Sequence, residues 1–169
     1  MKMNTGDRAV MNKAIMILLI VVAAFVLILI FAGKKGTPIA NFTDTITEQA
    51  ILNVNGKHLI AAVANTPRER EQGLSGTHFL NGSNGMFFIF EEADEHGFWM
   101  KDMTFSIDIL WINEDNEIVD IEQNVSPNTY PQIFKSDVPA KYVLEVMAGW
   151  TQENEVEVGD TVLISEVEQ

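Results

Sequence analysis

Residues 85–112 read GMFFIFEEADEHGFWMKDMTFSIDILWI and hold the densest apolar and aromatic side chains outside the N-terminal segment. Three apolar runs within this stretch, Met86–Phe90, Phe98–Met100 and Phe105–Ile112, are separated by turn-forming residues. Such spacing is typical of neighbouring buried strands. These runs therefore predict the central sheet of a domain that folds around them.

A hairpin is expected on the N-terminal side of this stretch. The apolar runs Ala50–Val54 and Lys57–Ala64 are joined by Asn55-Gly56, a pair that adopts the positive φ angles of a type I′ turn. A short helix should follow from Thr66 to about Gln72. Threonine can cap a helix, proline fits its first position, and the glutamate three residues after the cap can complete a capping box.

Three further strands are expected on the C-terminal side: Glu117–Glu122, Lys141–Met147 and Thr161–Val167. Ser126–Pro139 contains three prolines and no apolar period, so it is predicted to be a long loop, and Ala148–Asn154 is predicted to be a turn. Seven or eight short strands with one short helix predict a mainly β (α+β) domain. Its antiparallel sheet should be compact or close on itself like a barrel.

An uncharged segment of 19 residues, Ala14–Ala32, precedes this domain. As a helix rising about 1.5 Å per residue it would span about 28 Å, close to the thickness of a bilayer core. The sequence thus predicts an N-terminal tail (residues 1–13), a transmembrane helix (14–32), a linker (33–49) and a soluble domain (50–169). The linker contains glycine, lysine and proline with few apolar residues, as exposed linkers do.

A cleaved signal peptide is the alternative interpretation of the apolar segment. It fits less well, because signal peptides have shorter apolar regions and end in a small-x-small site, whereas this segment ends in Ile30-Phe31-Ala32. Three basic residues precede the segment and two follow it closely. This small excess predicts a cytoplasmic N-terminus, with a single-pass chain in the cell membrane and its domain outside the cytoplasm.

Charge and cysteine content exclude several kinds of site. Residues 37–169 carry six basic and 23 acidic side chains, and so a net charge of −17. Such a domain is repelled by phosphate backbones, so the bilayer and a small ligand or envelope protein are expected as partners, and nucleic acid is not. The chain has no cysteine, which rules out disulfides, thiolate metal sites and cysteine nucleophiles.

Several short motifs occur in an order that resembles the DUF192 family. They are Arg70-x-x-Gly73-Leu74, Gly85-Met86-Phe87-Phe88, Phe98-Trp99-Met100-Lys101, Ile107-Asp108-Ile109-Leu110, Tyr142-Val143-Leu144-Glu145 with Ala148-Gly149, and Gly159-Asp160-x-Val162. The resemblance covers about residues 50–166. It implies a compact, mainly β domain, often exported or anchored, with no established biochemical activity.

The chain departs from the family pattern at two places. Asp102-Met103 stands where asparagine and threonine are usual, and Ser75-Gly76-Thr77 replaces a methionine-x-arginine segment. The missing arginine removes a residue that could bind an anion in that loop.

Two carboxylates, Asp108 and Glu145, lie within apolar strands. A buried carboxylate must be paired or protonated, and Arg70 and Lys101 are the cations nearest to core-like motifs. One hypothesis is that these residues form structural ion pairs, with Arg70 as the keystone that pairs with one of the carboxylates. Another is that Arg70, Lys101, Asp108 and Glu145, with Trp99 as an apolar wall, bind a small ligand.

Catalysis is the third possibility for the same residues. An envelope hydrolase could use Asp108 and Glu145 as an acid–base pair if both face one cleft. The three histidines, His58, His78 and His96, match no metal-ligand spacing and are expected in exposed positions or loops. No metal or cofactor is therefore predicted, and a binding or interaction module is favoured over an enzyme.

Overall fold

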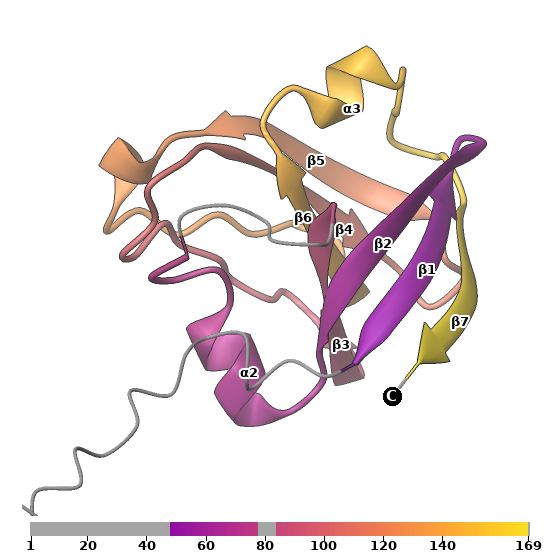
Figure 1. Ribbon diagram of the computed structural model, residues 1–169, viewed down its shortest axis with the longest axis horizontal. Helices are drawn as coiled ribbons and strands as arrows, with labels where there is room; N and C mark the ends of the chain where they lie inside the picture. The colour runs from indigo at the N-terminus through magenta and orange to yellow at the C-terminus, as the bar shows by residue number, and fades with distance from the viewer. Residues whose placement is uncertain (1–47, 78–83, 169) are drawn as a thin grey trace, which may run out of the picture. The chain divides into compact units, whose positions relative to one another are not determined.

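The computed structural model describes residues 48–77 and 84–168, without the side chains of residues 166–168 (Figure 1). The predicted anchor, tail and most of the linker lie outside the described residues. Within those two ranges, no helix is long and apolar enough to cross a membrane. The described residues belong to one compact unit.

Seven strands form a single sheet in the spatial order β5-β4-β6-β3-β2-β1-β7. In sequence these are β1 (Gln49–Val54), β2 (Lys57–Ala64), β3 (Gly85–Asp94), β4 (Ile107–Ile112), β5 (Ile118–Val125), β6 (Ala140–Met147) and β7 (Val162–Glu168). In the part of the chain that the structure describes, three short helices connect them: α2 (Pro67–Gln72), the 3₁₀ helix η2 (Pro127–Thr129) and α3 (Trp150–Glu153). The mainly β prediction is confirmed.

The sheet curls into a half-barrel, in which the two edge strands approach each other at one end (Figure 1). An isolated bridge joins Glu117, just before β5, to Thr161, just before β7. Backbone hydrogen bonds from Ile118 N to Asp160 O (2.9 Å) and from Val162 N to Asn116 O (2.8 Å) strengthen this junction. The barrel is therefore partly closed by its loops.

Alternating side chains divide the core between the two faces of the sheet. The inner cluster takes residues from all seven strands, including Leu52, Phe87 and Leu144. The outer cluster, with Met86, Phe88 and Ile109 at its centre, lies on the opposite face of β3, β4 and β6. Segments outside the strands cover this outer cluster, and a cavity lies there.

Local predictions around the first hairpin and helix are confirmed. Asn55 and Gly56 have φ angles of 50° and 79° in the turn between β1 and β2. The capping box of α2 is complete, since Glu69 N donates to Thr66 Oγ1 (3.3 Å) and Thr66 N donates to Glu69 Oε2 (3.0 Å). The helix leads into Leu74, which is buried.

Two segments were predicted wrongly, and one pair of strands is parallel within a mainly antiparallel sheet. Phe98–Met100 is a loop segment held by a single bridge between Phe98 and Phe134, not a strand. The segment predicted as a turn after β6 contains α3, so the domain has more than one helix. The strands β2 and β3 pair in parallel, because the chain crosses over through α2 before it returns to the sheet.

Candidate functional site

A cavity of about 250 Å³ lies over the outer cluster, between α2 and the segment that follows β3. Its apolar wall includes four aromatic rings, those of Phe88, Phe90, Phe98 and Trp99. Four titratable side chains also line it, those of Arg70, Glu71, His96 and Glu145. An apolar pocket with few polar groups is the usual form of a small-molecule site.

Glu145 lines this cavity from the central strand β6. Its register partners are Met86 of β3 and Ile109 of β4, both in the outer cluster, so its side chain faces the outer side of the sheet. The residue is 4% exposed. Its Oε2 atom has no hydrogen-bond partner among the described residues. A carboxyl group in this position lacks the compensation that buried polar groups normally have.

Burial raises the pKa of Glu145 to about 8. Loss of hydration disfavours the charged form, and no counter-ion in the described chain offsets that loss. Near pH 7 the group is therefore mostly a neutral carboxylic acid, able to donate a hydrogen bond or to ionise when a cation approaches.

Arg70 reaches the cavity from the last turn of α2. Its Nη1 atom donates to the backbone carbonyls of Asn65 and Ile89, the latter at 2.9 Å. Its guanidinium carbon lies 5.2 Å from the centre of the Phe90 ring. These contacts fix the cation at the edge of the cavity, where no carboxylate of residues 48–77 or 84–165 forms an ion pair with it.

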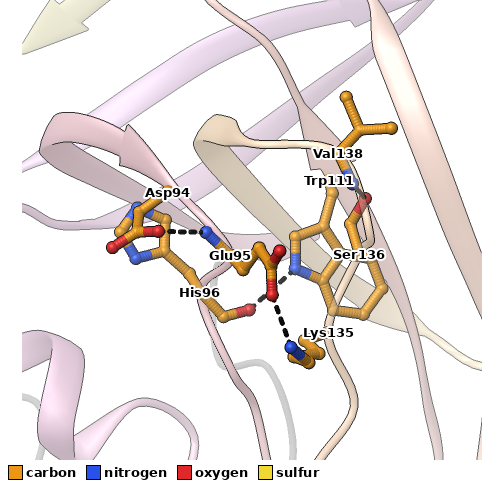
Figure 2. Close-up of polar contacts among 7 residues, drawn as sticks. All are labelled: Asp94, Glu95, His96, Trp111, Lys135, Ser136 and Val138. Atoms are coloured by element: carbon orange, nitrogen blue, oxygen red, sulfur yellow. Dashed lines mark hydrogen bonds and ion pairs between the residues drawn. The ribbon is translucent and has the colours of Figure 1, made fainter.

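His96 enters the cavity from the loop after β3, which several polar contacts hold in place (Figure 2). The indole Nε1 of Trp111 donates to His96 O (3.0 Å), and Lys135 forms an ion pair with Glu95. The imidazole stacks on Phe90 with ring centres 3.4 Å apart. Burial is the largest effect on the pKa of His96 and lowers it, and the charge of Arg70 also lowers it. The hydrogen bond to Glu92 O and the charge of Asp94 raise the pKa, but the net shift is downward.

Trp99 forms a shared wall between this cavity and a second one of about 280 Å³. Lys101 lines only the second cavity, with its ammonium nitrogen 5.9 Å from the Trp99 ring centre. Of the five residues predicted for the site, Arg70, Trp99 and Glu145 thus line one cavity and Lys101 lines its neighbour.

Asp108 lies elsewhere and has a structural role. Its carboxylate, on the opposite face of β4, accepts from Asn124 N (2.9 Å), Gly149 N (3.1 Å), Thr151 N (3.0 Å) and Thr151 Oγ1 (2.7 Å). Both oxygens are satisfied, and they hold the start of α3 and the end of β5 against the sheet. The side chain is fully buried.

The predicted pairings of these residues were wrong. Asp108 and Glu145 face opposite sides of the sheet, because Asp108 is opposite Val146 in the register and Ile109 is opposite Glu145. They cannot flank one substrate bond. Arg70 binds backbone carbonyls instead of either carboxylate, so the keystone ion pair is absent from the described residues. His96, expected in an exposed position or a loop, does lie in a loop, where it is half-buried and lines the cavity.

Replacement of Arg70 with alanine should lower the free energy of unfolding by about 2 kcal/mol, since two charged hydrogen bonds and one cation–π contact are lost. This is less than the loss expected for a buried ion pair, about 3 to 5 kcal/mol. Urea denaturation of residues 40–169 measures the change. Arg68→Ala, on the exposed side of the same helix, is the control and should change stability little. If Arg70→Ala lowers the free energy of unfolding no more than the control does, Arg70 has no structural role.

Comparisons with known proteins agree with this fold. The family DUF192, described as "Uncharacterized ACR, COG1430", matches residues 50–164. No curated protein matches the chain. A crystal structure from Novosphingobium aromaticivorans, of a protein of unknown function, has a TM-score of 0.64 and 21% identity, and covers 78% of this chain and 96% of its own.

A second crystal structure, from Sinorhizobium meliloti 1021, is that of a protein provisionally named a transcription regulator. It is 31% identical, with a TM-score of 0.62, and the match covers 69% of this chain and 92% of that one. The crystallised chain therefore consists almost wholly of this domain, so the fold forms there without further domains. The match over residues 50–164, with this relative, establishes that the chain belongs to the DUF192 family.

Proposed function

We propose that this protein is a small-ligand-binding module, anchored in the cell membrane by residues 14–32 and displayed outside the cytoplasm. The ligand site is the cavity lined by Glu145, Arg70, His96 and Trp99. The anchor and the orientation rest on the apolar segment and its basic flanks.

The observation that supports binding is the unpartnered Oε2 of Glu145 beside an aromatic-walled cavity. A buried carboxyl without a partner destabilises the fold, and such groups are concentrated at functional sites. A ligand that hydrogen-bonds to this atom would supply the missing partner. Asp108 does not offer a ligand a free carboxylate oxygen, because both of its oxygens accept hydrogen bonds from backbone and side-chain donors.

Binding is better supported than hydrolysis. Paired-carboxylate hydrolysis needs two carboxyl groups about 5 to 9.5 Å apart across one cleft. Asp108 and Glu145 point to opposite faces of the sheet, so the arrangement favours recognition of a ligand over cleavage of one.

The name of the Sinorhizobium meliloti relative raises the question of nucleic acid. For this chain the net charge of −17 over residues 37–169 opposes contact with phosphate backbones. The aromatic and carboxyl groups of the cavity also suit a small molecule better than a nucleic acid backbone.

A protein partner is the second candidate, because large apolar side chains are exposed beside the cavity. Trp99 is 45% exposed and packs against Tyr130, with ring centres 6.1 Å apart, and Ile133 is 60% exposed. An envelope protein could bind this surface while the cavity stays free.

The proposed topology predicts that protease added to intact cells digests the domain. If the domain survives in intact cells but is lost after lysis, it lies in the cytoplasm and the orientation is wrong. The N-terminal sequence of the mature protein is the second readout. A start near Gly33 would mean that residues 14–32 are a cleaved signal peptide.

A thermal-shift screen of small metabolites and cell-wall fragments against residues 40–169 tests the binding function. Hits should raise the Tm of the wild-type domain and have little effect on Trp99→Ala or Glu145→Gln. Glu122→Gln, an exposed carboxyl on β5, is the matched control and should respond like the wild type. Hits that stabilise all four proteins equally would place binding outside the cavity, and the absence of hits at millimolar concentration would leave protein interaction as the better function.

A further inference from the structure

We propose that the ligand is a small organic compound with a protonated amine, and that its ammonium group binds the Glu145 carboxyl group inside the cavity. This inference rests on the proposed function, since it names the ligand class of the same cavity.

The first support is that Glu145 has no hydrogen-bond partner for its Oε2 atom among the described residues. This Oε2 is buried, and in the ionised form it only accepts hydrogen bonds, so a donor brought by the ligand would complete it. Arg70 does not fill this role: its Nη1 atom donates to two backbone carbonyls, its guanidinium lies over Phe90, and no hydrogen bond joins it to Glu145 Oε2 among the described residues. An ammonium group supplies both the donors and the charge that a buried carboxylate requires.

The second support is the composition of the walls. Phe88 and Phe98 meet edge to face, with ring centres 4.9 Å apart, and Trp99 adds a third ring. Aromatic faces attract organic cations, and the same rings bury an apolar group attached to the amine. The walls and the carboxyl group therefore favour the same ligand class.

The third support is the charge around the site. The strongly acidic domain raises the local concentration of cations and lowers that of anions. The other titratable groups that line the cavity are Arg70 and Glu71 on α2 and His96 on the loop after β3. His96 is neutral near pH 7 because burial lowers its pKa. Arg70 is thus the single cation that faces the ligand among the described lining residues.

Binding of an ammonium ligand should change the protonation state of Glu145. To form the ion pair, the carboxylic acid of Glu145 must lose its proton to solvent while the amine keeps its own. With the pKa of Glu145 raised to about 8, binding at pH 7 should release about nine tenths of a proton, and binding at pH 9 about one tenth. Affinity should rise about tenfold between these pH values. A neutral ligand that accepts a hydrogen bond from the protonated acid would show the opposite trend.

Isothermal titration calorimetry of residues 40–169 tests this with three matched probes: phenethylamine, the neutral 2-phenylethanol and the anionic 3-phenylpropionate. Each titration is made at pH 7 and pH 9, in two buffers of different ionisation enthalpy, which reveals the protons released. Glu145→Gln is the test variant and Glu122→Gln the control.

Phenethylamine should bind most tightly, release protons as described, and lose at least tenfold in affinity with Glu145→Gln but not with Glu122→Gln. Tighter binding of 2-phenylethanol or 3-phenylpropionate would overturn the amine class while leaving the cavity as a ligand site. Phenethylamine binding that releases no proton, or that is unchanged by Glu145→Gln, would also overturn it. If none of the probes binds and the metabolite screen is empty, the proposed function fails as well.

Discussion

Replacement of Glu145 with glutamine should raise the free energy of unfolding by about 3 kcal/mol at pH 7. The pKa of this group is 4.5 in an exposed environment and about 8 in the folded domain. Between these values the folded state holds a proton that the unfolded state has lost. Stability therefore falls by about 1.4 kcal/mol for each pH unit from pH 4.5 to pH 8, and the contribution is constant above pH 8. Glutamine has a similar shape and no charge, so it avoids this loss.

Urea denaturation of residues 40–169 from pH 5 to pH 9 measures the effect. The difference between wild type and Glu145→Gln isolates this carboxyl group, because the shifted groups Glu69 and His96 are present in both proteins. The difference should grow with pH and level off near pH 8. Glu122→Gln, at an exposed position on β5, should change the stability little. A wild type more stable than Glu145→Gln at pH 8 would mean that the carboxylate has a partner in the free protein.

Replacement of Asp108 with asparagine should have the opposite effect, a loss of about 3 to 5 kcal/mol. Both carboxylate oxygens accept hydrogen bonds, from the backbone of Asn124, Gly149 and Thr151 and from the Thr151 hydroxyl. Asparagine offers one acceptor and turns an amide NH₂ toward donors that also carry hydrogens. At least one buried donor is then left unpaired, and the start of α3 is released from the sheet.

The control for this variant is Asp120→Asn on β5. Among the described residues, the Asp120 carboxylate accepts one hydrogen bond, from the neighbouring Ile121 N. Its replacement should therefore lower the free energy of unfolding by less than about 1 kcal/mol. Thermal and urea denaturation of both variants measure the difference. Equal small losses would contradict the structural role of Asp108 and reopen a functional one.

Local patterns in the sequence predicted most of the fold. The Asn55-Gly56 turn and the Thr66 capping box depend on adjacent residues, and both are formed as expected. The strand from Met86 to Phe90 was predicted from its apolar run. The segment Phe98–Met100 was wrongly predicted as a strand. Phe98 and Met100 pack on the outer cluster from a loop, and a run of apolar residues alone does not distinguish a buried strand from such a loop.

The candidate site was predicted less completely, because it depends on which sheet face each residue occupies. Alternation alone placed Asp108 and Glu145 in apolar surroundings, and both are buried. The register between β4 and β6, which sends them to opposite faces, is a tertiary property that neither strand encodes by itself. Nothing in the sequence around His96 indicated a site residue, apart from its place just before Phe98-Trp99. Its ring reaches the cavity because Phe90 stacks on it and Trp111 bonds to its backbone carbonyl.

The state of the Glu145 carboxyl group tests the central claim most directly. A ¹³C NMR titration of side-chain carboxyl groups in residues 40–169 should give an apparent pKa near 8 for Glu145. Adding a hit from the metabolite screen should shift the Glu145 resonance and leave that of Glu122 in place. A Glu145 carboxyl that titrates near 4.5 and does not respond to any hit would contradict a ligand site at this position.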